Sequence, residues 1–253
     1  MELLVVIAII VVLASIAYPV YIRIKMSSNK GVALNIMKQL GSAISSYAGQ
    51  HDGLLPSEDA TGKDTWESVK LPTADAAWYN ALLRMMPAKC AGDFSKEGRP
   101  AAFYTGENLL HLPGAEYPDS KKLQRPYFAI AMNTKLFRKD KDGKKPEVKI
   151  SNIQNTSRTV AFQEQGLPGE PKAHDSQSQG DFDGSPKGSG KSFVARYSKR
   201  GLISFFDGHA EEVSGKQLLT NTGELEWTSD TVNDPSAIIW TADPKEDPNG
   251  HAQ

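Results

Sequence analysis

The chain opens with an uninterrupted apolar run, whereas hydrophobic and polar positions alternate in short stretches over the rest of it. No charged side chain occurs from Leu3 to Ile22. About 20 apolar residues at about 1.5 Å per residue cover the ~30 Å hydrocarbon layer of a bilayer. Because the run is apolar on every side, it does not have the polar face of a buried core helix. We therefore predict that residues 1–24 form the transmembrane half of a helix.

A cleaved secretory signal peptide is the alternative for this segment. Such a peptide carries a basic residue before the apolar run and a small-residue cleavage site after it. Here the acidic Glu2 precedes the run in place of a basic residue. The run passes into Tyr18-Pro19-Val20-Tyr21 in place of a small-residue cleavage site, so the sequence favours an anchor. Pro19 lacks an amide hydrogen and clashes with the preceding turn, so we expect it to kink or loosen the helix.

A second helical pattern follows the membrane segment. Apolar residues recur at mostly three- and four-residue spacings, at Val32, Leu34, Ile36, Met37, Leu40, Ile44 and Tyr47. This spacing is typical of an amphipathic helix, which we expect over residues 25–50 as the continuation of the same helix, packed against a domain. Gly49 and the pair Asp52-Gly53 mark its end.

Residues 51–253 are predicted to form one α+β globular domain. A short helix is expected over residues 76–86, before Pro87. Short β-branched or aromatic runs separated by turn residues then indicate an antiparallel sheet. The predicted strands cover residues 100–106, 125–134, 147–153, 158–165, 191–198 and 201–213.

Turn residues divide this domain. Asp142-Gly143 is typical of a hairpin loop, and Asp207-Gly208 is interpreted as the structural turn between two strands. The segment 166–190 is rich in Gly, Ser, Pro and Asp, which predicts a long exposed loop. The Pro- and Asp-rich C-terminal tail is expected to be mobile.

Composition and charge limit the function. With 39% hydrophobic and 23% charged residues, the chain is an ordinary folded protein and neither disordered nor a polytopic membrane protein. A net charge of −1 provides no global excess of positive charge for a phosphate backbone, so no nucleic acid partner is expected. The single cysteine, Cys90, is interpreted as a small buried residue.

We find no motif that indicates an enzyme, and we predict no catalytic residue and no metal ligand. The segment SPKGSGKS at 185–192 resembles a phosphate-binding loop, but Ser185 replaces its first glycine and no helix pattern follows. The five histidines have no metal-binding spacing. No cofactor is assigned, because two segments resemble the start of a calcium loop but neither has the glutamate at the twelfth position that closes such a site. These are Asp140-x-Asp142-Gly143 and Asp181-x-Asp183-Gly184, and turn chemistry is the favoured interpretation of both.

The string ELLVVIAIIVVLASIAYPVY resembles the N-terminus of type IV pilins and of the pseudopilins of type II secretion. In that family a glutamate opens the apolar run, which Glu2 matches, and a helix-loosening proline follows, which Pro19 matches. The resemblance implies a pilin-like fold, in which a long N-terminal helix is transmembrane in its first half and packs on an antiparallel β-sheet in its second.

The resemblance also implies processing. Family members lose a short basic leader ending in glycine to a prepilin peptidase, and their new N-terminal residue, usually phenylalanine, becomes methylated. We expect that leader upstream of an internal Met1. A basic leader would also set the topology, because Arg23, Lys25 and Lys30 follow the apolar run and nothing basic precedes it. The globular domain would then lie on the periplasmic side of the bacterial inner membrane.

A second resemblance lies in the C-terminal region. The strand run that ends in GLISFFDGHAEEV is similar to that of bacterial prepilin-like proteins that carry a histidine, nine residues and Asp-Gly. Asp207 and Gly208 match the end of this motif. Tyr197 occupies the histidine position, so no role of that histidine is carried over.

These resemblances imply a filament subunit whose partners are copies of itself, other pilin-like subunits and an inner-membrane assembly platform. Glu2 is the predicted assembly residue, because pairing its carboxylate with the N-terminal ammonium of an adjacent subunit relieves two poorly solvated charges. A type II secretion pseudopilus and a type IV pilus-like filament both fit. Because calcium stabilises some major pseudopilins, the resemblance also implies that calcium is possible here, with unassigned ligands. The alternative is a membrane-anchored extracytoplasmic module, for example one that binds polysaccharide, that does not polymerise.

Overall fold

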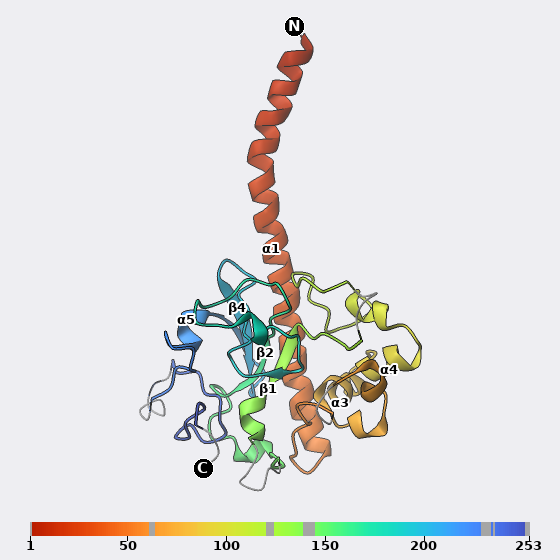
Figure 1. Cartoon of the computed structure of the whole chain (residues 1–253), viewed down its shortest axis with the longest axis vertical. Coiled ribbons are helices and arrows are strands. Elements are labelled where there is room, and N and C mark those ends of the chain that lie inside the picture. The colour runs from red at the N-terminus through yellow and green to blue at the C-terminus, as the bar shows by residue number, and fades with distance from the viewer. Residues whose placement is uncertain are drawn as a thin grey trace.

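The computed structural model describes residues 2–60, 64–119, 124–138, 145–228, 234 and 236–250. A long helix, α1 (Glu2–Gln50), projects from a globular part that contains one β-sheet and several short helices (Figure 1). The second half of α1 lies within the globular part, and the first half stands free of it. The fold class is α+β with a long N-terminal helix, as predicted.

The second half of α1 carries the apolar stripe that holds it to the domain. Its buried side chains are Ala33, Ile36, Met37, Leu40, Ala43, Ile44, Tyr47 and Ala48. Val32 was placed on this stripe by its spacing but is 42% exposed, because the adjacent Ala33 takes the buried position. After the helix ends, Asp52 and Gly53 adopt positive φ angles of 53° and 82°, in agreement with the predicted stop.

The sheet has five strands in the order β3-β1-β2-β4-β5. Their bounds are β1 Ile130–Asn133, β2 Val160–Glu164, β3 Lys187–Gly188, β4 Arg200–Phe205 and β5 Ala210–Ser214. The pairs β1–β2, β2–β4 and β4–β5 are antiparallel, as predicted. Strand β3 pairs parallel to β1, so the sheet is mixed and the prediction of a purely antiparallel sheet was wrong. Parallel pairing needs a long connection, and the chain returns from β1 to β3 only after forming β2.

Short helices complete the globular part. Helix α3 (Trp78–Met85) contacts α1 and confirms the helix predicted before Pro87. The other helices are α2 (Trp66–Val69), α4 (Ala91–Lys96) and α5 (Gly215–Leu218). Single 3₁₀ turns cover η1 (Pro72–Ala74), η2 (Pro100–Tyr104), η4 (Thr134–Phe137), η5 (Ile150–Asn152) and η6 (Gln179–Asp181).

Three of the predicted strands are not strands. Residues 100–106 contain η2, residues 147–153 contain η5 after a single bridge, and residues 191–198 form only isolated bridges. Phe103 and Phe193 are nevertheless fully buried. The apolar runs therefore reported burial correctly, while their backbone conformation is set by tertiary contacts.

The segment 166–190 is a long, mostly irregular loop that is exposed only in part. Every second residue from Phe182 to Gly190 is buried. Gly166 permits this packing, because a Cβ there would lie 2.5 Å from the ring of Phe182. Glycine in this segment allows close approach of packed side chains as well as turns.

The described part of the C-terminal tail, residues 236–250, packs on the sheet. The N–H of Val160 donates to the carbonyl of Ile239 at 2.9 Å. The side-chain amide of Asn133 donates to the carbonyl of Trp240 at 2.8 Å. Both Ile239 and Trp240 are buried, because the tail extends along the sheet.

The turn that contains Asp207 and Gly208 joins β4 to β5 and packs against α1. Gly208 has a φ of 90°, which favours glycine. The carboxylate of Asp207 accepts the N–H of His209 at 3.0 Å and closes the turn. A Cβ added at Gly41 of α1 would lie 2.7 Å from the Cα of Gly208, so backbone meets backbone here.

Two alanine substitutions in α1 test this contact. Gly41→Ala is expected to lower the free energy of unfolding by about 1–3 kcal/mol, because the new methyl group overpacks the turn. Gly31→Ala is the matched control, since nothing lies within 4 Å of its Cβ position. It is expected to stabilise the helix by up to about 1 kcal/mol. Thermal unfolding of the full chain in detergent measures both, and shifts of the same sign would contradict the contact.

Candidate functional site

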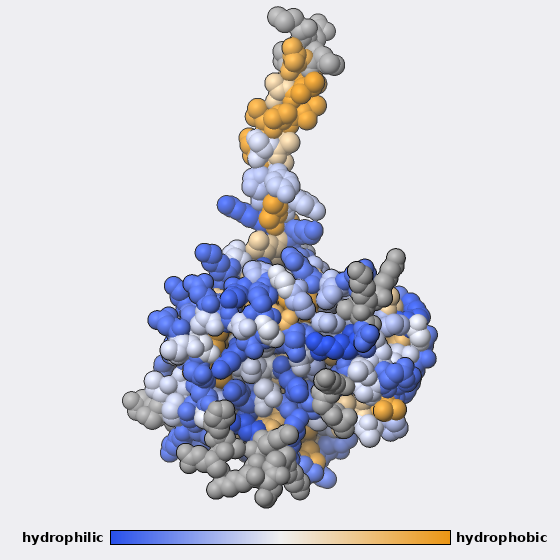
Figure 2. Space-filling view, viewed as in Figure 1, coloured by the Kyte–Doolittle hydropathy of each residue, from blue (hydrophilic) through white to orange (hydrophobic). Residues whose placement is uncertain are grey.

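The first half of α1 is an exposed apolar surface. Its large hydrophobic side chains between Leu4 and Ile24, as far as the structure describes them, are each at least 39% exposed. Figure 2 shows orange residues gathered along the stalk, whereas blue residues cover most of the globular part. Soluble monomers rarely expose contiguous apolar patches larger than a few hundred Å². This surface therefore requires lipid or protein to cover it.

This half of α1 is long and apolar enough to cross a bilayer. An 18-residue window of the helix has a mean hydropathy of 2.2, and none of that window is buried. Apolar residues follow one another from Ile9 to Leu13, so no face is polar. The hydroxyl of Ser15 donates to the carbonyl of Val12 at 2.7 Å, so Ser15 brings no unpaired donor into an apolar environment.

The free half of α1 ends at a band of aromatic and basic side chains. Tyr18 and Tyr21 are exposed, and the exposed Arg23 and Lys25 follow them. Tyrosine beside lysine or arginine is typical of a membrane–water interface. One helical turn further on, the amine of Lys30 lies 3.0 Å from a carboxylate oxygen of Glu212 in β5. This ion pair ties α1 to the sheet where the helix enters the globular part.

Glu2 and Pro19 are the two residues of α1 singled out from the sequence. Pro19 lies inside the helix, which continues through it without interruption. Because proline has no N–H, the carbonyl of Ser15 loses its usual helical partner there. Glu2 begins α1 at the end farthest from the globular part, and its side chain lies outside the described part of the structure (Figure 1). Its role in assembly stays a prediction.

Tyr197, at the position of the motif histidine, is buried. Its hydroxyl donates to Oε1 of Glu164 at 3.1 Å. Burial, reinforced by the negative charge of Glu164, raises the pKa of the Tyr197 hydroxyl. This side chain therefore supports the interior between β2 and β4 and is not accessible to a ligand.

Arg196 forms the centre of a buried ionic cluster beside Tyr197. Its guanidinium, only 3% exposed, lies 3.2 Å from Glu164 and 2.5 Å from Glu170. Backbone N–H groups donate further hydrogen bonds to these carboxylates. The N–H of Leu202 donates to Glu164 at 2.9 Å, and the N–H of Leu167 donates to Glu170 at 2.8 Å. Burial raises the pKa of Glu164, although Arg196 opposes that shift. The cluster fastens the long loop to the sheet.

The aspartate-rich segments do not form a metal site in the part of the chain that the structure describes. The carboxylate of Asp183 accepts the N–H of Ser185 at 2.9 Å, and Gly184 has a φ of 63°, which is turn chemistry. No group of three or more His, Cys, Asp or Glu side chains is placed to hold a metal among the described residues. Asp140 and the predicted hairpin turn Asp142-Gly143 lie outside those residues.

The remaining candidates for chemistry are structural. Cys90 is buried, as predicted, and its thiol donates to Asp93 at 3.1 Å. Burial raises the pKa of the thiol, so little of the reactive thiolate is present. In the segment 185–192, the two-residue strand β3 is not followed by a helix, so the scaffold of a phosphate-binding loop is missing there.

Comparison with known proteins identifies no relative of this chain. No family model matches its sequence, no curated protein matches it, and no solved structure matches its fold.

Proposed function

We propose that this chain is a pilin-like subunit that assembles, through the free half of α1, into a type II secretion pseudopilus or a type IV pilus-like filament. The observation that supports the proposal is the division of one 49-residue helix into an exposed apolar half and a buried half. A simple anchor needs only about 20 residues. Here the anchor continues without a break into the core of the domain.

Assembly exchanges contact with lipid for contact with neighbouring helices. Lipid and helix surfaces are about equally apolar, so the gain comes from close packing and from polar pairing. Small residues that let helix backbones approach recur in the free half, at Ala8, Ala14 and Ala17. Glu2 supplies the polar contribution by pairing with the N-terminal ammonium of an adjacent subunit.

The proposal also implies a membrane topology and a set of partners. The free half of α1 spans the inner membrane once, and the globular part lies in the periplasm. The aromatic and basic band from Tyr18 to Lys25 then marks the interface nearest the globular part. The partners are copies of this chain, other pilin-like subunits, an inner-membrane assembly platform, and a prepilin peptidase that acts on a leader.

The alternative is an extracytoplasmic binding module that uses α1 only as an anchor. A polar cleft in the globular part, described below, favours a binding function. In that case the protein would remain a monomer in the membrane.

Chemical crosslinking of the full chain in its native membranes separates these two functions. An amine-reactive crosslinker is expected to yield a ladder of dimers, trimers and larger species that contain this chain. If the chain stays monomeric after crosslinking at the same protein concentration in the membrane, the filament subunit is rejected and the binding module is favoured.

A further inference from the structure

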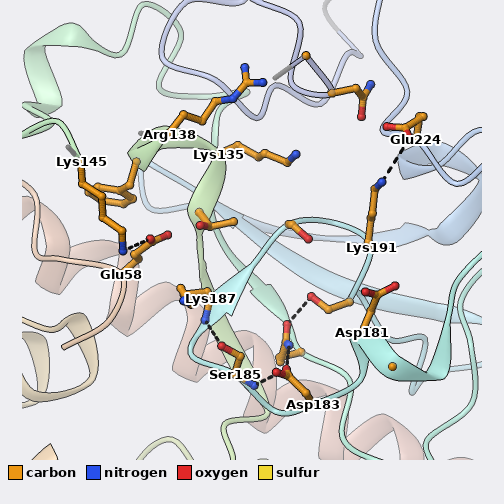
Figure 3. A pocket seen from close by; sticks show the side chains of 18 residues that line it. Glu58, Lys135, Arg138, Lys145, Asp181, Asp183, Ser185, Lys187, Lys191 and Glu224 are labelled. Atoms are coloured by element: carbon orange, nitrogen blue, oxygen red, sulfur yellow. Dashed lines mark hydrogen bonds and ion pairs between the residues drawn. The ribbon is translucent and has the colours of Figure 1, made fainter. Parts of the chain in front are cut away.

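A polar cleft of about 770 Å³ opens in the globular part (Figure 3). Segments far apart in sequence line it, because the parallel pairing of β3 with β1 brings Lys187 next to Met132. Helix η4 forms one wall and the end of the long loop forms another. Its volume lies in the usual range for small-ligand sites, about 300–1,000 Å³.

One end of the cleft is electrically balanced. The amine of Lys145 lies 2.5 Å from Glu58 and 2.9 Å from Asp59. The amine of Lys187 lies 3.0 Å from the other carboxylate oxygen of Asp59. Both carboxylates are almost fully buried, so these ion pairs form a fixed wall of the cleft.

The other end holds three cations, Lys135, Arg138 and Lys191. Arg138 and Lys191 have exposed partners, Glu246 and Glu224, each at 3.3 Å. Exposed pairs of this kind are worth only about 0–1 kcal/mol and are easily exchanged. Lys135 has no ion pair or hydrogen bond from its amine within the described residues.

Lys135 is the least compensated of these cations. Figure 3 shows its amine pointing into the open space of the cleft, on the side of Lys191. Partial burial, followed by the positive charges of Arg138 and Lys191, lowers the pKa of Lys135, although Glu224 and Asp247 oppose that shift. Three cations thus converge where an anion would relieve their mutual repulsion.

Groups that bind hydroxyls line other parts of the cleft. The hydroxyls of Thr134, Ser185 and Ser189 and the carboxylates of Asp181 and Asp183 line the same cleft. Donors and acceptors of both kinds suit a ligand that carries many hydroxyl groups together with a negative charge.

We propose that this cleft binds an acidic saccharide, with its carboxylate or sulfate group among Lys135, Arg138 and Lys191 and its hydroxyl groups against the serine and aspartate side chains. The inference is independent of filament assembly, because the cleft lies away from the free half of α1. It gives the protein an anionic glycan ligand whether the chain polymerises or not.

Titration calorimetry of the full chain in detergent micelles tests this proposal. The probes are trigalacturonate, which carries carboxylates, a heparin-derived tetrasaccharide, which carries sulfates, neutral maltotriose and inorganic sulfate. At least one acidic saccharide is expected to bind more tightly than maltotriose and than sulfate. Lys135→Gln is expected to weaken that binding about tenfold, the loss of one charge-assisted hydrogen bond.

Two further variants make the result specific. Lys135→Arg keeps the charge and is expected to retain most of the affinity. Lys96→Gln changes an exposed side chain of α4 outside the cleft and is expected to bind as the wild type does. The proposal is overturned if neither acidic saccharide binds, if maltotriose binds as tightly, or if Lys135→Gln has no effect. Sulfate alone binding as tightly as the saccharides would also overturn it, because the cleft would then be a simple anion site.

Discussion

Replacing Arg196 with leucine is expected to lower the free energy of unfolding by about 3–5 kcal/mol. The substitution removes the one cation shared by Glu164 and Glu170 and leaves both carboxylates buried without it. Leucine fills most of the space but offers no donor, so the penalty is electrostatic. Thermal unfolding of the full chain in detergent measures the loss as a lowered Tm.

Arg99→Leu is the matched control for this prediction. Arg99 also pairs with two carboxylates, those of Glu97 at 3.6 Å and Glu107 at 2.8 Å, but all three side chains are well exposed. Its loss is expected to cost about 0–1 kcal/mol. Equal effects of the two substitutions would show that burial does not determine the cost and would contradict the account of the cluster.

The pH dependence gives a second measurement on the same variant. Burial raises the pKa of Glu164, so folding shifts this group toward its protonated form relative to the unfolded chain. This contribution is fully present below the unfolded pKa and is lost as the pH rises through the folded pKa. Without Arg196 the folded pKa should rise further. The stability deficit of Arg196→Leu is therefore expected to shrink as the pH is lowered, and a deficit that grows would contradict it.

Replacing Glu2 with valine is expected to abolish assembly and leave membrane insertion intact. Valine lengthens the apolar run, so the helix still enters the bilayer at least as readily. It removes the carboxylate proposed to pair with the neighbouring N-terminal ammonium, and apolar contact alone does not favour a helix over lipid. Crosslinking in membranes measures assembly, and resistance to carbonate extraction measures insertion.

Glu67→Val is the control for this second prediction, because Glu67 is exposed on α2 and belongs to the globular part. It is expected to give the wild-type ladder. A normal ladder from Glu2→Val would remove the proposed role of Glu2, and so would a variant that fails to enter the membrane.

The parts of the fold predicted from sequence are those with strong local patterns. Helix α1 combines a uniformly apolar half with a half of three- and four-residue spacing, and α3 stops before a proline. Strand β2 and the hairpin of β4 and β5 are β-branched or aromatic runs with turn residues between them. In each case neighbouring residues determine the outcome, so the printed sequence suffices.

The polar cleft could not be predicted, because it depends on a contact with no local pattern. Strand β3 has only two residues, Lys187 and Gly188, which give no alternation to detect. Its parallel pairing with β1 places Lys187 and Lys191 near Lys135, about 50 positions earlier in the chain. A cluster of lysines and arginines near residue 138 and a pair of lysines near residue 187 were the only features of the sequence that indicated the cleft.

The packing of the tail and of the long loop could not be predicted for a related reason. Composition rich in Gly, Pro and Asp predicts exposure, yet Ile239 and Trp240 are buried beside the sheet and Phe182 is buried against Gly166. These are tertiary contacts between distant segments, and the local composition of either partner does not reveal them.

Site-specific photocrosslinking from the free half of α1 tests the central claim most directly. A photoreactive amino acid placed at Ile16, which is 63% exposed, reports what covers that surface in the native membrane. The account predicts an adduct between two copies of the chain whose crosslinked peptides map to residues 2–24 of both, while the same group at Lys96 captures none of these residues. Adducts to lipid alone at Ile16 would contradict it.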